Sequence, residues 1–199
     1  MSKKSSLHTR RGFSQRVVET RSLRKRFLIV CEGEKTEPNY FRGFRAPGRT
    51  VDIRGIGYNT DSLVREAIRI MKQDEYDQVW CVFDRDSFPA KNFNAAFELA
   101  RSNNIQIAYS NEAFELWYLL HYDYHQSAIP RTDYIKILSS KLGRRYEKNS
   151  ETIFDDLENK VQTAIRNARR LLTNYGPQNP EKDNPSTTVH LLVTELLNP

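Results

Sequence analysis

Carboxylates follow two apolar stretches of the chain, at the points where each stretch ends. Residues 27–31 are apolar and rich in strand-forming types, and they end at Glu32. Residues 79–83 have the same character and end at Asp84, with Asp86 two positions on. Because open α/β sheets bind ligands at the carboxyl ends of their strands, we expect the three acids to meet at one sheet edge. Such a cluster suits a hard cation.

The residues beside these acids have their own expected roles. Side chains alternate along a strand, so Asp84 and Asp86 should project to one side and Arg85 to the other. Arg85 is therefore expected to pair elsewhere, with substrate contact as the alternative. Lys35 lies near a predicted helix start and is placed to steady a substrate phosphate, helped by the helix N-terminus.

A fourth acid opens a predicted helix further along the chain. The segment 111–122 is helical in pattern, and Glu115 falls in its first turn, next to the end of the preceding strand. A carboxylate there is able to complete a metal cluster. The alternative is that Glu115 only complements the helix dipole, an effect of about 0.3–1 kcal/mol.

Composition limits the class of protein. A chain of 199 residues suits one domain of ordinary size. Its net charge of +6 favours a polyanionic partner, nucleic acid above all. Residues 1–26 carry nine Lys or Arg against the single acid Glu19, so we expect a flexible arm that either meets nucleic acid or is simply solvated. Both cysteines fall within predicted buried strands, and neither a leader nor a long apolar run is seen. A cytoplasmic protein with no membrane contact is expected.

The order of predicted elements indicates an α/β fold. Strands alternate with helices up to about residue 125, which predicts a central, mostly parallel sheet of about four strands with helices on both faces. The predicted organisation is a basic arm at 1–26, an α/β domain at 27–125 and a helical extension at 126–199 packed on the same core. The extension contains helical patterns at 132–142, 154–175 and 189–197. The last is apolar enough to suggest a homodimer.

Four stretches together resemble the RloB-like family. They are VCEGEKTEPNYF at 30–41, FDRD at 83–86, FELWYLLH at 114–121 and NPSTTVH at 184–190. The resemblance implies a Toprim-type domain, the fold shared by primases, topoisomerases and OLD-type nucleases. It implies that Glu32 matches the Toprim glutamate and that Asp84 and Asp86 match its paired aspartates, with Glu115 as a further acid. It also implies a bacterial defence protein acting in abortive infection with an ABC-type or OLD-like partner ATPase.

The chemistry of these acids agrees with that resemblance. Phosphodiester cleavage needs a sink for negative charge and an activated water, and Mg²⁺ or Mn²⁺ held by carboxylates supplies both. Asp84 and Asp86 would hold the ion, while Glu32 either ligates it or serves as a general acid or base. We therefore expect a metal-dependent nuclease that acts on DNA or RNA, with tRNA as one possible substrate.

Several alternatives remain beside the nuclease. A non-catalytic nucleic-acid-binding or sensing module would keep the fold without the reaction, and a primase-like phosphoryl-transfer enzyme would need nucleotide-binding elements that we do not see. Residues 33–36 resemble the end of a phosphate-binding loop, but the glycine expected before them is missing. His121 and His125 are spaced to share a zinc ion, although packing of His121 among aromatic neighbours is the simpler expectation.

Overall fold

The computed structural model describes residues 24–44, 48–57, 60–85 and 90–198. Two predictions from the sequence fall outside these ranges. They are the direction of Asp86 and the behaviour of residues 1–23 of the basic arm.

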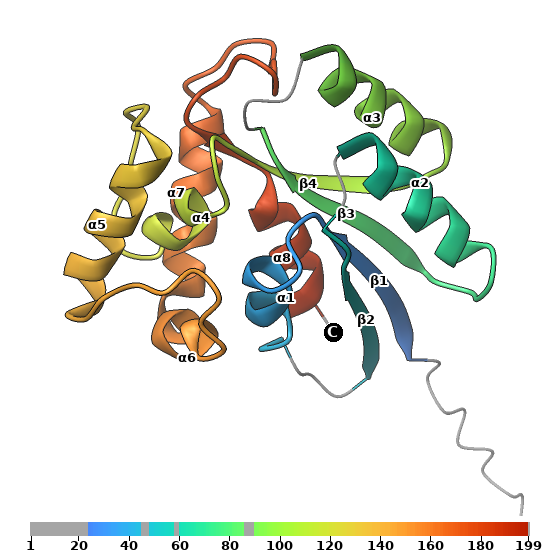
Figure 1. The fold of residues 1–199 in the computed structure, drawn as a ribbon, viewed down its shortest axis with the longest axis horizontal. Helices are drawn as coiled ribbons and strands as arrows, with labels where there is room; N and C mark the ends of the chain where they lie inside the picture. The colour runs from blue at the N-terminus through green and yellow to red at the C-terminus, as the bar shows by residue number, and fades with distance from the viewer. Residues whose placement is uncertain (1–23, 45–47, 58–59, 86–89, 199) are drawn as a thin grey trace, which may run out of the picture.

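A five-stranded sheet forms the centre of the molecule, in the order β2-β1-β3-β4-β5 (Figure 1). The parallel strands are β1 (Lys25–Cys31), β2 (Arg49–Gly55), β3 (Gln78–Asp84) and β4 (Gln106–Asn111). The prediction of an α/β fold with a mostly parallel sheet is confirmed, but the predicted count of about four strands is one short. The fifth strand, β5 (Ser186–Thr187), pairs antiparallel with β4. Two polar residues carry no alternating pattern, so the sequence does not mark them as a strand.

Apolar side chains cover both faces of the sheet. Leu28 and Val30 of β1 face one core, where they meet α2 (Thr60–Met71) and α3 (Ala90–Ser102). The alternate residues of β1 face a second core, which includes side chains from α1 (Thr36–Phe41) and α8 (Val189–Leu197). The two helix layers lie on opposite sides of the sheet in Figure 1. Burial on both faces explains why β1 and β3 are continuously apolar.

The second core continues into the C-terminal half of the chain. It is built there from α4 (Glu115–Leu120), α5 (Arg131–Leu142), α6 (Ile153–Leu157) and α7 (Val161–Leu172). The single helix predicted over 154–175 is instead divided, because the 3₁₀ turn η1 (Glu158–Lys160) separates α6 from α7. One apolar cluster thus joins residues of both halves of the chain.

Helix α8 uses its apolar face inside the molecule. Val189, Leu192, Val193 and Leu196 are buried in the second core, whereas Leu191 and Leu197 are exposed. The apolar pattern that suggested a homodimer is thus explained by packing within the chain, and the dimer stays a prediction. Within the described ranges, no helix combines the length and the apolar character needed to cross a membrane.

Candidate functional site

The ends of β1 and β3 bring Glu32 and Asp84 together. The register pairs Cys31 with Val82, and the backbone N–H of Glu32 donates to the carbonyl of Val82 at 2.9 Å. The backbone N–H of Asp84 in turn donates to Oε2 of Glu32 at 3.1 Å. Parallel pairing of two adjacent strands that both end in an acid therefore places these two carboxyl groups at one edge of the sheet.

A cavity of about 150 Å³ lies at this edge. Its walls come from the loop after β1, the starts of α1, α4 and α5, the end of β3, and the segment before α6. The lining residues are Glu32, Gly33, Thr36, Glu37, Asp84, Phe114, Glu115, Arg131 and Lys148. Four of these nine are acids and two are cations, so the cavity concentrates titratable side chains.

Asp84 is the best-buried acid of the two strand ends. Its Oδ2 accepts a hydrogen bond from Nη2 of Arg131 at 2.8 Å. Its Oδ1 is buried and has no hydrogen-bond partner among the described residues. Burial raises the pKa of Asp84 well above its ordinary value, and the charges of Glu37 and Glu115 raise it further, since each disfavours a second negative charge nearby.

Glu37 and Glu115 enter the cavity from the first turns of α1 and α4. Both side chains are buried, and within the described part of the chain neither Oε2 atom has a hydrogen-bond partner. Oε1 of Glu115 accepts from the hydroxyl of Tyr146 at 3.4 Å. The pKa of Glu37 is raised, first by burial and then by the charge of Glu115, while Lys148 acts in the opposite direction.

The other predicted side chains lie away from this cavity. Lys35 precedes α1, is exposed, and does not line the cavity. Arg85 follows the strand alternation, since its guanidinium stands 5.3 Å from the ring centroid of Phe93 on the opposite core. Asp86 is not described. The structure therefore unites Glu32, Asp84 and Glu115 and places Lys35 and Arg85 elsewhere.

Three charged lining residues, Glu37, Arg131 and Lys148, have no role in the sequence-based prediction. Glu37 stands five positions after Glu32 and falls in the first turn of α1, as Glu115 falls in the first turn of α4, and this shared position is the signal that was available. Arg131 and Lys148 carry no such signal, because they come from the C-terminal half and reach the cavity only through the packing of α5 and of the loop before α6.

The carboxylates suit a cation in their chemistry. Three buried carboxyl oxygens, on Glu37, Asp84 and Glu115, have no hydrogen-bond partner among the described residues, and carboxylate oxygens are the ligands that a hard divalent ion takes. Across the described ranges, however, no three His, Cys, Asp or Glu side chains are grouped closely enough to hold a metal. Complete coordination of a metal ion here therefore needs either a further ligand or a movement of these side chains toward one another.

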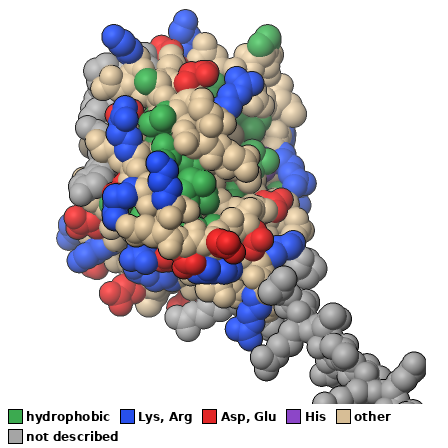
Figure 2. Space-filling model, turned by 90° about the vertical axis from the view of Figure 1, so that its right-hand side faces the viewer, with side chains coloured by type: hydrophobic (Ala, Val, Ile, Leu, Met, Phe, Trp, Pro, Cys, Tyr) green, Lys and Arg blue, Asp and Glu red, His purple; other side chains and the backbone are tan. Residues whose placement is uncertain are grey.

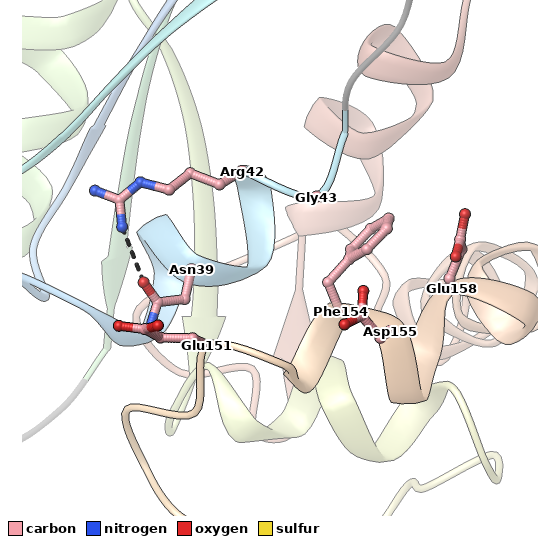
Figure 3. Close-up of a pocket in the computed structure, with 7 residues that line it drawn as sticks. All are labelled: Asn39, Arg42, Gly43, Glu151, Phe154, Asp155 and Glu158. Atoms are coloured by element: carbon pink, nitrogen blue, oxygen red, sulfur yellow. Dashed lines mark hydrogen bonds between the residues drawn. The ribbon is translucent and has the colours of Figure 1, made fainter.

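A second, larger cavity of about 660 Å³ lies between α1 and α6 (Figure 3). Its acids Glu151, Asp155 and Glu158 are exposed, and Arg42 is held by a hydrogen bond of 2.9 Å to Oδ1 of Asn39. Solvent already stabilises these charges, so they lack the strong demand for a counter-ion seen at the sheet edge. We therefore take the smaller cavity as the candidate site.

His121 belongs to the core, as the sequence predicts. Its Nε2 lies 3.1 Å from the hydroxyl of Tyr40, and its Nδ1 lies 2.9 Å from the carbonyl of Trp117. Burial lowers its pKa to about 4. Both ring nitrogens are engaged, which argues against a zinc site shared with His125.

The net positive charge is not gathered on the face that carries α2 and α3. Figure 2 shows basic and acidic side chains interspersed there. Ion pairs such as Arg65 with Asp61 and Arg69 with Glu66 contribute to this mixture. The described residues of this face therefore form no continuous basic surface for a polyanion.

Fold and cavity together define an α/β protein with a buried carboxylate cluster at the carboxyl edge of a mostly parallel sheet. The chain belongs to the RloB-like protein family, whose model matches residues 27–196. No curated protein and no solved structure matches the chain. The family match spans the sheet, the cavity and the C-terminal helices, so every residue that lines the cavity lies within it.

Proposed function

We propose that this RloB-like protein is a metal-dependent nuclease with a Toprim-type core, cleaving phosphodiester bonds in DNA or RNA. In this proposal it serves a bacterial anti-phage or abortive-infection system together with a partner ATPase. The observation that carries the catalytic part is the group of unpartnered buried oxygens on Glu37, Asp84 and Glu115 in one cavity. The defence role and the ATPase rest on family resemblance alone.

Each acid has a role in the proposed reaction. Asp84, Glu37 and Glu115 would hold Mg²⁺ or Mn²⁺, and the ion when bound supplies charge neutralisation and an activated water. Glu32 accepts the backbone N–H of Asp84 and so orients the end of β3 toward the cavity. Glu32, which is not among these metal ligands, would serve as the general acid or base of the cleavage step.

The proposal is tested by metal binding and cleavage with the full chain. Calorimetry with Mn²⁺ and incubation with labelled single-stranded DNA, double-stranded DNA and RNA, including tRNA, compare the wild type with Asp84→Asn and Glu115→Gln. Asp155→Asn is the matched control, because it removes an exposed acid from the second cavity. We expect binding and cleavage to be lost in the two site variants and kept in the control.

A non-catalytic binding module is the second candidate, and one observation favours it. Arg131 already neutralises Asp84 through an ion pair of 2.8 Å, as a structural charge cluster would require. Cleavage that persists in both Asp84→Asn and Glu115→Gln would overturn the proposed centre. A folded wild type that binds neither Mn²⁺ nor Mg²⁺ would favour the binding module.

A further inference from the structure

Arg131 is the cation in closest contact with the candidate site. It is the first residue of α5, directly after Pro130, whose φ of −58° and ψ of 145° set the direction in which the helix begins. Its Nη2 donates to Oδ2 of Asp84 at 2.8 Å. The two side chains differ in exposure, at 39% for Arg131 and 9% for Asp84. The guanidinium therefore bridges a buried carboxylate and the solvent.

The two proposed ligands of the cavity, a divalent cation and a phosphodiester, have opposite charges and need opposite surroundings. A divalent cation needs Asp84, whose Oδ2 is engaged by Arg131. A phosphodiester is an anion, and the carboxylates of the cavity repel it unless positive charge is supplied. Arg131 is suited to supply it, because a guanidinium binds phosphate oxygens with two parallel hydrogen bonds.

Lys148 is a second cation that lines the cavity, and hydrogen bonds to the backbone of its loop fix the position of that loop. The carbonyl of Lys148 accepts the hydroxyl of Thr36 at 3.0 Å, and the carbonyl of Asn149 accepts the side-chain amide of Asn39 at 3.0 Å. These bonds fasten the loop to α1, beside Glu37, whose pKa Lys148 acts to lower. The backbone of Lys148 is thus held beside α1, whereas the guanidinium of Arg131 contacts Asp84 and is partly exposed to solvent.

We propose that Arg131 is an exchangeable counter-ion that pairs with Asp84 when no divalent cation is bound and with a substrate phosphate when one is. This assignment rests on the proposed function. Arg131 is then a substrate-binding residue that competes with the cation for Asp84. Two opposite effects follow from removing it, namely tighter cation binding and weaker nucleic-acid binding.

Both effects are measured without any turnover. Arg131→Gln, Arg131→Lys and the wild type are titrated with Mn²⁺ by calorimetry, and separately with a cleavage-resistant phosphorothioate oligonucleotide in saturating Mn²⁺ by fluorescence anisotropy. Lys136→Gln is the matched control, because it removes one positive charge from the same helix, where Lys136 pairs with Asp133 at 3.0 Å. Circular dichroism confirms that each variant is folded.

For Arg131→Gln we expect Mn²⁺ affinity to rise at least threefold and oligonucleotide affinity to fall about tenfold relative to the wild type. Arg131→Lys keeps a charge but not the planar fork, so it should fall between the two. Lys136→Gln should leave Mn²⁺ affinity within twofold.

Two outcomes overturn the assignment. One is Mn²⁺ affinity in Arg131→Gln equal to that of the wild type, and the other is oligonucleotide affinity no lower than that of Lys136→Gln. If neither the wild type nor Arg131→Gln binds Mn²⁺, the proposed metal centre fails instead. If the wild type binds Mn²⁺ but either of the two overturning outcomes is found, the metal centre stands and only the role of Arg131 is removed.

Discussion

Gly33 lies directly against the carboxyl group of Glu37. A Cβ atom built on Gly33 would stand 2.1 Å from Oε2 and 2.9 Å from Cδ of Glu37. The loop after β1 therefore approaches the first turn of α1 as closely as a residue without a side chain allows. This contact holds Glu37 against the loop that carries Glu32.

Substitution of Gly33 should displace Glu37. For Gly33→Ala we expect a loss of about 1–3 kcal/mol in the free energy of unfolding, since the added methyl group forces the carboxylate or the loop to move. If Glu37 holds the cation, Mn²⁺ affinity falls as well. Urea denaturation and calorimetry measure the two effects. Gly176→Ala is the control, because a Cβ there meets nothing within 4 Å. Equal stability of the two variants would contradict the prediction.

The raised pKa of Glu37 should make the isolated protein less stable as pH rises. The folded state binds this proton more tightly than the unfolded state, whose carboxyl has the ordinary pKa of 4.5. Stability is therefore lost as pH increases above about 4.5, and each unit by which the pKa is raised costs about 1.4 kcal/mol.

Glu37→Gln removes this titration. We expect the variant to match the wild type near pH 4 and to become the more stable protein by pH 7, as measured by urea denaturation in EDTA. Glu158→Gln is the control, because Glu158 is exposed in the second cavity. A stability gap that does not widen with pH would show that the burial of Glu37 is already compensated.

His121 should produce the opposite dependence on pH. Its pKa is lowered from 6.5 to about 4 by burial, so between these values the unfolded state binds more protons than the folded state. Stability is present above pH 6.5 and is lost as pH falls toward 4. Between pH 7 and pH 5 the loss from this residue is about 2 kcal/mol.

His121→Phe keeps an aromatic ring but cannot titrate. The absolute stabilities of the two proteins are not compared, since in the variant the hydroxyl of Tyr40 also loses its hydrogen-bond partner at 3.1 Å. The expected signature is instead a smaller change in unfolding free energy between pH 7 and pH 5, by about 2 kcal/mol. If the free energy of unfolding changes with pH equally in both proteins, this role for His121 is ruled out.

Two neighbouring leucines of α8 separate packing within the chain from association between chains. Leu192 is fully buried, whereas Leu191 is 45% exposed. Leu192→Ala should cost about 2–5 kcal/mol of unfolding free energy, and Leu191→Ala should stay within about 0.5 kcal/mol. Chemical denaturation measures both. A large concentration-dependent loss in Leu191→Ala, with a shift in sedimentation, would instead support the predicted dimer.

The parts of the fold that follow from local pattern are predicted well from the sequence. The apolar runs that form β1 and β3 each end at an acid, so the sequence shows where these strands stop. Pairing the two strands side by side then brings Glu32 and Asp84 together. Alternation places Arg85 on the face opposite Asp84, and a helix start places Glu115 in a first turn. Each of these inferences needs only a few consecutive residues.

The parts that depend on distant contacts are not predicted. Arg131 meets Asp84 across 47 positions of the chain. Thr36 holds the loop of Lys148 across 112 positions. Strand β5 is a strand only because β4 offers it an edge, with Thr187 Oγ1 donating to the carbonyl of Tyr109 at 2.9 Å. No local pattern encodes such pairs, since either partner alone is an ordinary polar residue.

The acids and the cations of the cavity occupy separate stretches of the sequence. The carboxylates fall between Glu32 and Glu115, where they are fixed by strand ends and helix starts, whereas Arg131 and Lys148 follow in the C-terminal half. The charge balance of the cavity is therefore adjustable by substitutions that leave the sheet untouched. Under the proposed function, the residues that begin α5 and precede α6 would then set which anion the cavity admits, while the acids stay the same.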